Sequence, residues 1–169
     1  MASKYPLSSH VKAFGIGIVV AVIGIVAYLQ FGGSASSPAI SSDELPTVTV
    51  YRSPTCQCCE QWVDHLRANG FQVDMQDRND MQQVKQHYNV PRELASCHTG
   101  VVGGYVVEGH VPADEIKRLL AERPGVAGIT VPGMPVGSPG MERGNQQDPY
   151  NVLTFTQQGE ANVFARYNQ

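Results

Sequence analysis

A cluster of three cysteines directly after a β-branched segment is the feature that most constrains the fold. Residues 47–51, TVTVY, are β-branched and aromatic, which predicts a strand. A Ser-Pro-Thr turn follows, with Thr55 as a candidate helix cap, and positions 56–59 then contain Cys-Gln-Cys-Cys. An apolar pattern at helical spacing continues until Asn69-Gly70 supplies a stop signal. The thiols are therefore expected at the junction of a strand and the start of a helix.

The pattern after this unit continues to alternate between strands and helices. It predicts a strand at 71–75, a helix from 80 to before Pro91, two short strands within 98–107, a helix over 112–123, and a closing hairpin from 151–156 and 161–166. Residues 124–149 contain five prolines and predict a loop. The order β-α-β-α-β-β-α indicates an α/β layered domain. The position of the cysteines within that order predicts a thioredoxin-like domain over residues 47–169, with a C-terminal loop and hairpin extension.

An uncharged apolar segment precedes the predicted domain. Residues 13–31 number 19 and include one strongly polar side chain, Gln30. At ~1.5 Å per residue they would span roughly 28 Å, close to the hydrocarbon thickness of a bilayer. Lys4 and Lys12 lie before the segment, so residues 1–12 are expected in the cytoplasm and the rest of the chain outside. The length favours an uncleaved transmembrane anchor.

A cleaved signal peptide is the competing interpretation of this segment, since Gly33-Ser34-Ala35 offers small residues for cleavage. Both interpretations export the domain, which in a bacterium means the periplasm. Residues 32–46 are rich in Ser, Pro and Ala and predict a flexible linker. We therefore expect a periplasmic domain tethered to the inner membrane.

The charge balance excludes one class of partner. The chain carries 12 basic and 15 acidic residues, for a formal net charge of −3, and both Lys4 and Lys12 lie in the N-terminal segment. The remaining 10 basic and 15 acidic residues leave the exported part at −5. A mildly acidic domain without a basic run argues against nucleic acid as the main partner.

Two overlapping spacings in the cysteine cluster indicate two kinds of chemistry. Cys56 and Cys59 form the CxxC spacing of redox-active thiols. Cys56 and Cys58 form a CxC pair that suits a soft metal ion. Backbone N–H groups at a helix start lower thiol pKa values, and a thiolate is both a nucleophile and a soft ligand. Cys97 lies ahead of the predicted 98–107 hairpin, where a thioredoxin-like topology would bring it to face the cluster.

Two imidazoles and two thioethers are further candidate ligands. His98 follows Cys97 directly, and His110 follows the predicted hairpin. Met134 and Met141 each end a Pro-Gly-Met unit in the 124–149 loop. A thioether is a soft ligand that favours Cu(I) and does not form disulfides. An ordinary polar role for the histidines and a packing role for the methionines stay open, whereas His65 and His87 are predicted at the surface.

Thiolates together with thioethers and imidazoles suit Cu(I) best among the metals expected outside the cytoplasm. Three cysteines within four residues are too crowded for one tetrahedral ion, so we expect sulfurs that bridge several Cu(I) ions. Zinc, two structural disulfides, and a thiol-disulfide oxidoreductase using Cys56 and Cys59 are the alternatives. Cys58 inside the CxxC counts against the oxidoreductase, because a third thiol offers a rival pairing. Passive copper storage shares all the ligands with a redox role, and the sequence does not separate the two.

Four motifs in one order resemble the CopG-type periplasmic copper-resistance proteins, a family formerly catalogued as a domain of unknown function. They are Cys56-Gln57-Cys58-Cys59, Ser96-Cys97-His98-Thr99, residues 107–112 (VEGHVP) and residues 132–142 (PGMPVGSPGME). The resemblance implies a thioredoxin-like domain that binds copper through its cysteines as a cysteine-bridged Cu(I) cluster and acts in copper tolerance. It also implies that the protein interconverts Cu(I) and Cu(II). The expected partners are copper ions and periplasmic copper chaperones, exporters or oxidases.

Overall fold

The computed structural model describes residues 45–169, and its sheet is organised around the strand β1 (Val48–Arg52). β1 pairs in parallel with β2 (Val73–Asp77) and antiparallel with β3 (Thr99–Val102). Val48 and Val50 are fully buried, and Thr49 and Tyr51, which alternate with them, are half-buried. This alternation of the β-branched segment explains why it lies inside the sheet.

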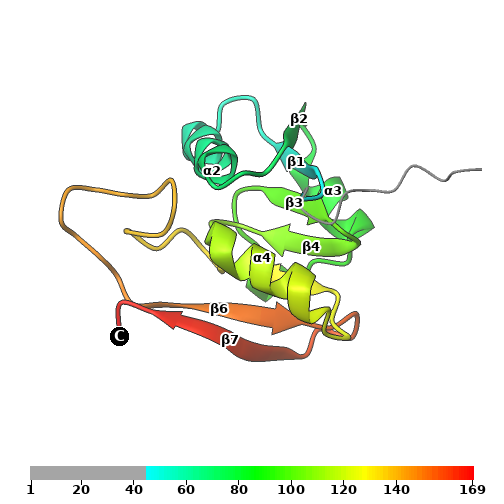
Figure 1. Cartoon of the computed structure of the whole chain (residues 1–169). Coiled ribbons are helices and arrows are strands. Elements are labelled where there is room, and N and C mark those ends of the chain that lie inside the picture. Colours follow the sequence, from blue (N-terminus) through cyan, green and yellow to red (C-terminus); the bar gives the residue numbers. More distant parts are fainter. Residues whose placement is uncertain (1–44) are drawn as a thin grey trace, which may run out of the picture. The chain divides into compact units, whose positions relative to one another are not determined.

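Seven strands form one mixed sheet in the order β2-β1-β3-β4-β5-β6-β7 (Figure 1). The strands not yet named are β4 (Tyr105–Glu108), β5 (Gly128–Thr130), β6 (Tyr150–Phe155) and β7 (Ala161–Tyr167). β4 and β5 are parallel, whereas β3–β4, β5–β6 and β6–β7 pair antiparallel. The predicted C-terminal hairpin therefore extends the same sheet instead of forming a separate unit.

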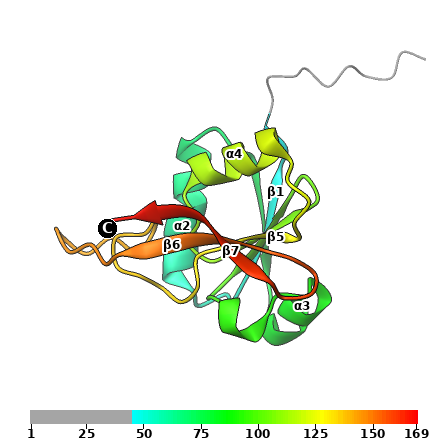
Figure 2. The same ribbon diagram turned by 90° about the horizontal axis from the view of Figure 1, so that it is seen from below.

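Helices cover both faces of this sheet. α2 (Gln57–Ala68) and α4 (Ala113–Glu122) bury Trp62 and Ile116 in the larger core cluster with β1. α3 (Met81–His87) and the short 3₁₀ turn η1 (Arg92–Leu94) belong to the opposite side, where a smaller cluster gathers around Phe155. Figure 2 shows α2 and α4 on one side of the strands and α3 on the other. The α/β layered architecture predicted from the sequence is confirmed.

One strand lies inside the segment predicted as loop. β5 occupies Gly128–Thr130, within residues 124–149. A Cβ atom at Gly128 would lie 2.1 Å from the carbonyl oxygen of Val106, so only glycine permits the close approach of β5 to β4. Three residues that begin with glycine carry no strand periodicity, which is why the pattern concealed this element.

Within residues 45–169, no helix has the length and apolar character needed to cross a bilayer. The apolar segment 13–31 and the preceding residues 1–12 lie outside the described residues, as does most of the linker 32–46. The anchor or signal segment stays a prediction.

Candidate metal centre

The cysteine cluster forms the first turn of α2. Cys56 is the residue that caps the helix, with φ −83° and ψ 95°, and no side chain caps the exposed N–H groups. The hydroxyl of Thr55, the expected cap, instead lies 3.1 Å from that of Ser53.

A buried arginine at the end of β1 holds this turn in place. Arg52 donates a hydrogen bond of 3.1 Å to the Cys56 carbonyl and forms ion pairs with Glu60 at 3.0 Å and Asp77 at 3.2 Å. Its side chain is only 6% exposed. The guanidinium therefore joins β1, α2 and β2 directly beside the cysteines.

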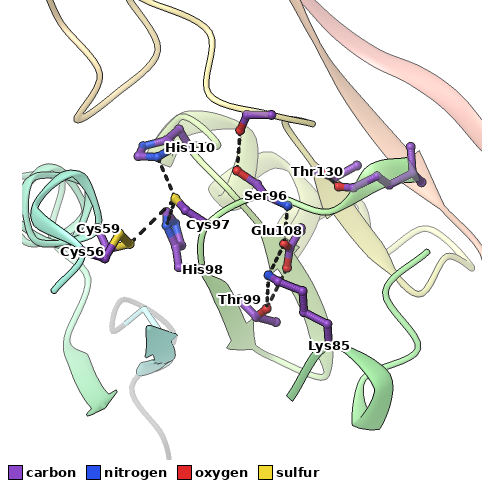
Figure 3. A network of polar contacts seen from close by, with 12 residues as sticks. Cys56, Cys59, Lys85, Ser96, Cys97, His98, Thr99, Glu108, His110 and Thr130 are labelled. Carbon is purple, nitrogen blue, oxygen red and sulfur yellow. Dashed lines mark hydrogen bonds and ion pairs between the residues drawn. A yellow bond between two sulfur atoms is a disulfide. The ribbon is translucent and has the colours of Figure 1, made fainter. Parts of the chain in front are cut away.

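The four cysteine sulfurs converge from two distant segments. The Sγ atoms of Cys56, Cys58, Cys59 and Cys97 all lie within 4.8 Å of one another. Cys97 Sγ is 3.9 Å from Cys58 Sγ and 3.7 Å from Cys59 Sγ. Cys56 and Cys59 form a disulfide, which leaves Cys58 and Cys97 as the free thiols of the described part of the chain (Figure 3). Reduction of this one bond would expose four thiols around one point.

Two buried imidazoles extend the sulfur cluster on the Cys97 side. Cys97 Sγ lies 3.2 Å from His98 Nδ1 and 3.1 Å from His110 Nε2 (Figure 3). Both histidines are fully buried, and the His98 ring packs on Trp62 with 4.3 Å between ring centroids. His110 Nδ1 lies 2.8 Å from the Pro139 carbonyl, which fixes the orientation of the ring. Cys97 is therefore shared by a four-sulfur group and a sulfur–imidazole group.

Burial controls the protonation of these groups. Burial raises the pKa of the Cys97 thiol to about 12, and the adjacent Cys58 thiol adds to this shift. Burial lowers the pKa of His98 well below its ordinary value, and the nearby His110 and Lys85 act in the same direction. Burial also lowers the pKa of His110. At neutral pH the imidazoles are thus uncharged, with a lone pair for a metal, while Cys97 keeps its proton until a cation replaces it.

The proline-rich loop, residues 124–149, packs closely against the backbone of α2 at Gly140. A Cβ atom at Gly140, which has φ +79°, would lie 2.7 Å from the backbone nitrogen of Trp62 and 2.9 Å from the Cys58 carbonyl oxygen. Met141 follows this contact and is half-buried, whereas Met134 is 53% exposed. The loop therefore half-buries the Met141 side chain and leaves that of Met134 largely in solvent.

Comparisons with known proteins bear directly on this arrangement. A solved structure titled "Copper resistance protein copG- Form 1" is 49% identical and covers 75% of this chain and 100% of its own, with a TM-score of 0.71. The corresponding Form 2 structure is 50% identical over 73% of this chain and 99% of its own, with a TM-score of 0.70.

The chain belongs to the CopG family. A family model described as "Protein of unknown function, DUF411" also matches residues 94–141, which include Cys97, His98 and His110. No curated protein matches the chain. The resemblance to the CopG family inferred from the four sequence motifs is confirmed.

His65 and His87 were both predicted at the surface, and the structure places them in different surroundings. His87 is exposed, as expected, and its ring contacts Tyr88 edge to face. His65 is half-buried, and its Nε2 atom accepts a 3.0 Å hydrogen bond from the backbone N–H of Ala113. His65 therefore links α2 to the start of α4, and the surface prediction was wrong in that respect.

Sequence analysis of this CopG-family chain missed Arg52, Lys85 and Glu108. Lys85 and Glu108 are both buried, and they form an ion pair beneath the Cys97 segment. Lys85 comes four residues after Met81 and one after Val84, so helical spacing puts it on the same face as these two apolar residues, and this position was the available signal. No local pattern marks Arg52, because its partners come from separate elements.

Substitution of Gly140 tests the contact between the loop and α2. We expect Gly140→Ala to lower the free energy of unfolding by about 1–3 kcal/mol more than Gly144→Ala, because an added methyl group must displace backbone atoms. Gly144 also has positive φ, at +57°, but nothing lies within 4 Å of its Cβ position. Urea unfolding of both variants measures the difference. Equal losses would show that the loop does not press on α2.

The buried histidines should make stability depend on pH. The pKa of His98 is lowered in the folded state, so below its ordinary value of 6.5 the unfolded chain takes up the proton first and unfolding is favoured. The reduced, metal-free protein should lose about 1.4 kcal/mol per pH unit for His98 alone as the pH falls below about 6.5. Urea unfolding of wild type and His98→Phe from about pH 7 to about pH 5 measures how much of the pH dependence of the unfolding free energy comes from His98. His87→Phe, at an exposed site, should leave the slope unchanged, and an unchanged slope in His98→Phe would contradict the assignment.

Proposed function

We propose that this protein is an exported copper-binding protein of copper tolerance that holds Cu(I) through Cys56, Cys58, Cys59 and Cys97. The observation that carries the proposal is the convergence of these four sulfurs within 4.8 Å, from segments about 40 residues apart. The solved relatives are named copper resistance proteins, which supports copper as the metal. Copper is the cargo of this site.

The donor set supports Cu(I) over harder ions. Thiolates are soft ligands, and a group of four sulfurs with neutral imidazoles beside it suits Cu(I). Three thiols in one helical turn crowd a single tetrahedral ion, whereas sulfurs that bridge several Cu(I) ions relieve that crowding. The site is therefore proposed to hold more than one copper ion.

The fold that supports this site is proposed to be thioredoxin-like. The strands run in the order β2-β1-β3-β4, with β1 and β2 parallel and β3 antiparallel to β1. α2 begins at the cysteines after β1, and Cys97 lies two residues before Thr99, the first residue of β3. This arrangement supports the prediction made from the cysteine positions.

His98, His110, Met134 and Met141 are proposed to complete or cover the site. The imidazoles are supported by their 3.2 Å and 3.1 Å distances to Cys97 Sγ. Met141 is supported by its place in the loop that contacts α2, and the exposed Met134 suits a role in copper entry or transfer. A neutral imidazole beside the thiolates would help to hold Cu(II), so the site is proposed to interconvert Cu(I) and Cu(II).

The proposed location is the periplasm, with the N-terminal segment 13–31 as an inner-membrane tether. The arrangement of Lys4 and Lys12 before that segment supports export. The proposed partners are copper chaperones, exporters or oxidases in that compartment.

One observation favours a second function, thiol-disulfide exchange. Cys56 and Cys59 are joined in a disulfide with 5.4 Å between their Cα atoms. Against this function, Cys58 Sγ lies 3.5 Å from Cys56 Sγ and offers a competing partner inside the CxxC. The two functions differ in what the reduced protein retains, which is copper in one case and only reducing equivalents in the other.

Copper loading of the reduced protein tests the main proposal. After reduction, addition of Cu(I) and washing with a competing chelator, we expect more than one copper per wild-type chain by elemental analysis. Cys97→Ser should bind Cu(I) at least ~10–100-fold more weakly, because it removes a ligand shared by all parts of the site. His87→Ala, at an exposed imidazole, is the control and should match wild type.

Each alternative outcome of this experiment has a defined meaning. One metal per chain would contradict the multinuclear site, and a preference for zinc would contradict copper. Wild-type copper binding by Cys97→Ser would contradict the convergence of four ligands. X-ray absorption on air-exposed and reduced samples then distinguishes redox turnover from storage by whether the copper oxidation state changes.

Insulin reduction by the metal-free protein tests the second function. We expect weak activity, since the Cys58 thiol competes for the Cys56–Cys59 pair. Cys56→Ser and Cys59→Ser should each abolish copper retention while changing this weak activity little in absolute terms. Full exchange activity in wild type that both substitutions eliminate, together with no Cu(I) retention, would establish the oxidoreductase instead.

A further inference from the structure

A buried ion pair lies on the far side of the sheet from the cysteines. Val107 belongs to the core under α2 and α4, so the next residue of β4, Glu108, points to the opposite face, toward α3. There its carboxylate accepts a 2.5 Å hydrogen bond from Lys85 Nζ. Glu108 is completely buried and Lys85 is 8% exposed.

The carboxylate of Glu108 has three donors, and one of them belongs to the cysteine segment. The backbone N–H of Ser96, the residue before Cys97, donates to Glu108 Oε1 at 2.6 Å. The hydroxyl of Thr99 donates to Glu108 Oε2 at 2.7 Å and accepts from Lys85 Nζ at 3.2 Å. Figure 3 shows this network beside Cys97 and His98.

The backbone beside Glu108 holds the other end of the same segment. The Gly109 N–H donates to the His98 carbonyl at 3.1 Å. Gly109 has φ +73°, and a Cβ atom there would lie 2.6 Å from Ser96 Oγ. The segment 96–98 is therefore hydrogen-bonded at both ends to two consecutive residues. Glu108 accepts from the Ser96 N–H, and the Gly109 N–H donates to the His98 carbonyl.

Stability alone does not account for an ion pair at this place. Removing a carboxylate and an ammonium from water costs several kcal/mol for each ion, and apolar residues of similar size often serve stability equally well. What an apolar pair cannot supply is an acceptor for the Ser96 N–H. Ser96 directly precedes Cys97, so the hydrogen bond from the Ser96 N–H to Glu108 helps to set the position of the Cys97 thiol.

We infer that Glu108, charged and held by Lys85, is a positioning residue that sets where Cys97 Sγ lies relative to the thiols of α2. This inference rests on the proposed function, since it is the copper site whose geometry Glu108 would determine. The carboxylate acts through the Ser96 amide and does not itself touch the metal ligands. Partners behind metal ligands typically change metal affinity ~10–100-fold when removed.

Two double variants separate positioning from a merely structural role. Both remove the ion pair without leaving a charge unpaired. Glu108→Leu with Lys85→Met also removes the acceptor for the Ser96 N–H, whereas Glu108→Gln with Lys85→Met keeps an amide oxygen there. Glu115→Gln is the control, because the carboxylate of Glu115 is also largely buried but is bonded to Tyr167 and Arg118.

The readouts cover the metal-free and the copper-loaded protein. In the reduced metal-free protein, the rate of Cys97 alkylation by iodoacetamide reports the placement of the thiol. In the loaded protein, copper retention against a chelator and Cu–S and Cu–Cu distances from X-ray absorption report the site. Thermal unfolding of each variant shows whether it is folded.

We expect the Leu/Met variant to alkylate Cys97 at an altered rate, to retain copper ~10–100-fold more weakly, and to show changed metal distances. The Gln/Met variant should recover most of these losses at a similar unfolding temperature. Wild-type readouts from a folded Leu/Met variant would overturn the inference. Equal losses in both variants, or failure of only the Leu/Met variant to fold while Gln/Met retains no copper, would also overturn it, because the acceptor would then not matter.

The same experiment distinguishes this inference from the proposed function. If wild type retains no copper but Cys97 alkylation still differs between the two variants, the positioning role stands and the copper function fails. If wild type retains copper and neither readout differs between the variants, the copper function stands and the positioning role fails.

Discussion

The antiparallel pairing of β1 with β3 is the contact on which the candidate metal centre depends. Tyr51 pairs with Thr99, so the chain leaves β1 toward the cysteines at the same place where it enters β3 after Cys97. Antiparallel neighbours necessarily put the end of one strand beside the start of the other. Two segments far apart in sequence thereby bring four sulfurs within 4.8 Å, without any long side chain to bridge them.

Partial burial gives this centre its chemical character, because Cys59, His98 and His110 are buried while Cys56, Cys58 and Cys97 are half-buried. Trp62 packs on His98, and Gly140 packs on the α2 backbone beside Cys58 and Trp62. Burial disfavours charged imidazoles and a Cys97 thiolate, so His98, His110 and Cys97 stay neutral in the metal-free protein. A bound cation would supply the compensating charge and release the proton of Cys97. Glu108 lies in the same buried surroundings, where its carboxylate accepts from the N–H of Ser96, the residue before Cys97.

The local patterns predicted most of the elements within two residues, because strand alternation, helical spacing and glycine turns are properties of short segments. They missed β5, whose three residues begin with the glycine that lets β4 and β5 approach. They placed His65 at the surface, since its bond to the Ala113 N–H comes from a helix 48 residues away. They also did not predict the Lys85–Glu108 ion pair, because its two residues come together only when α3 packs on the sheet.

The amino-acid sequence alone determined which candidate ligands the chain offers and the order in which they occur along it. Thiols at a strand–helix junction, a fourth cysteine before a hairpin, and two Pro-Gly-Met units are already visible as letters. Only the tertiary structure decided that Cys97 is shared between sulfurs and imidazoles, that Cys56 and Cys59 are joined, and that Met134 is in solvent while Met141 lies in the covering loop. The physical reason is that distance, burial and a buried ion pair's partners arise from contacts between remote segments, which no local pattern encodes.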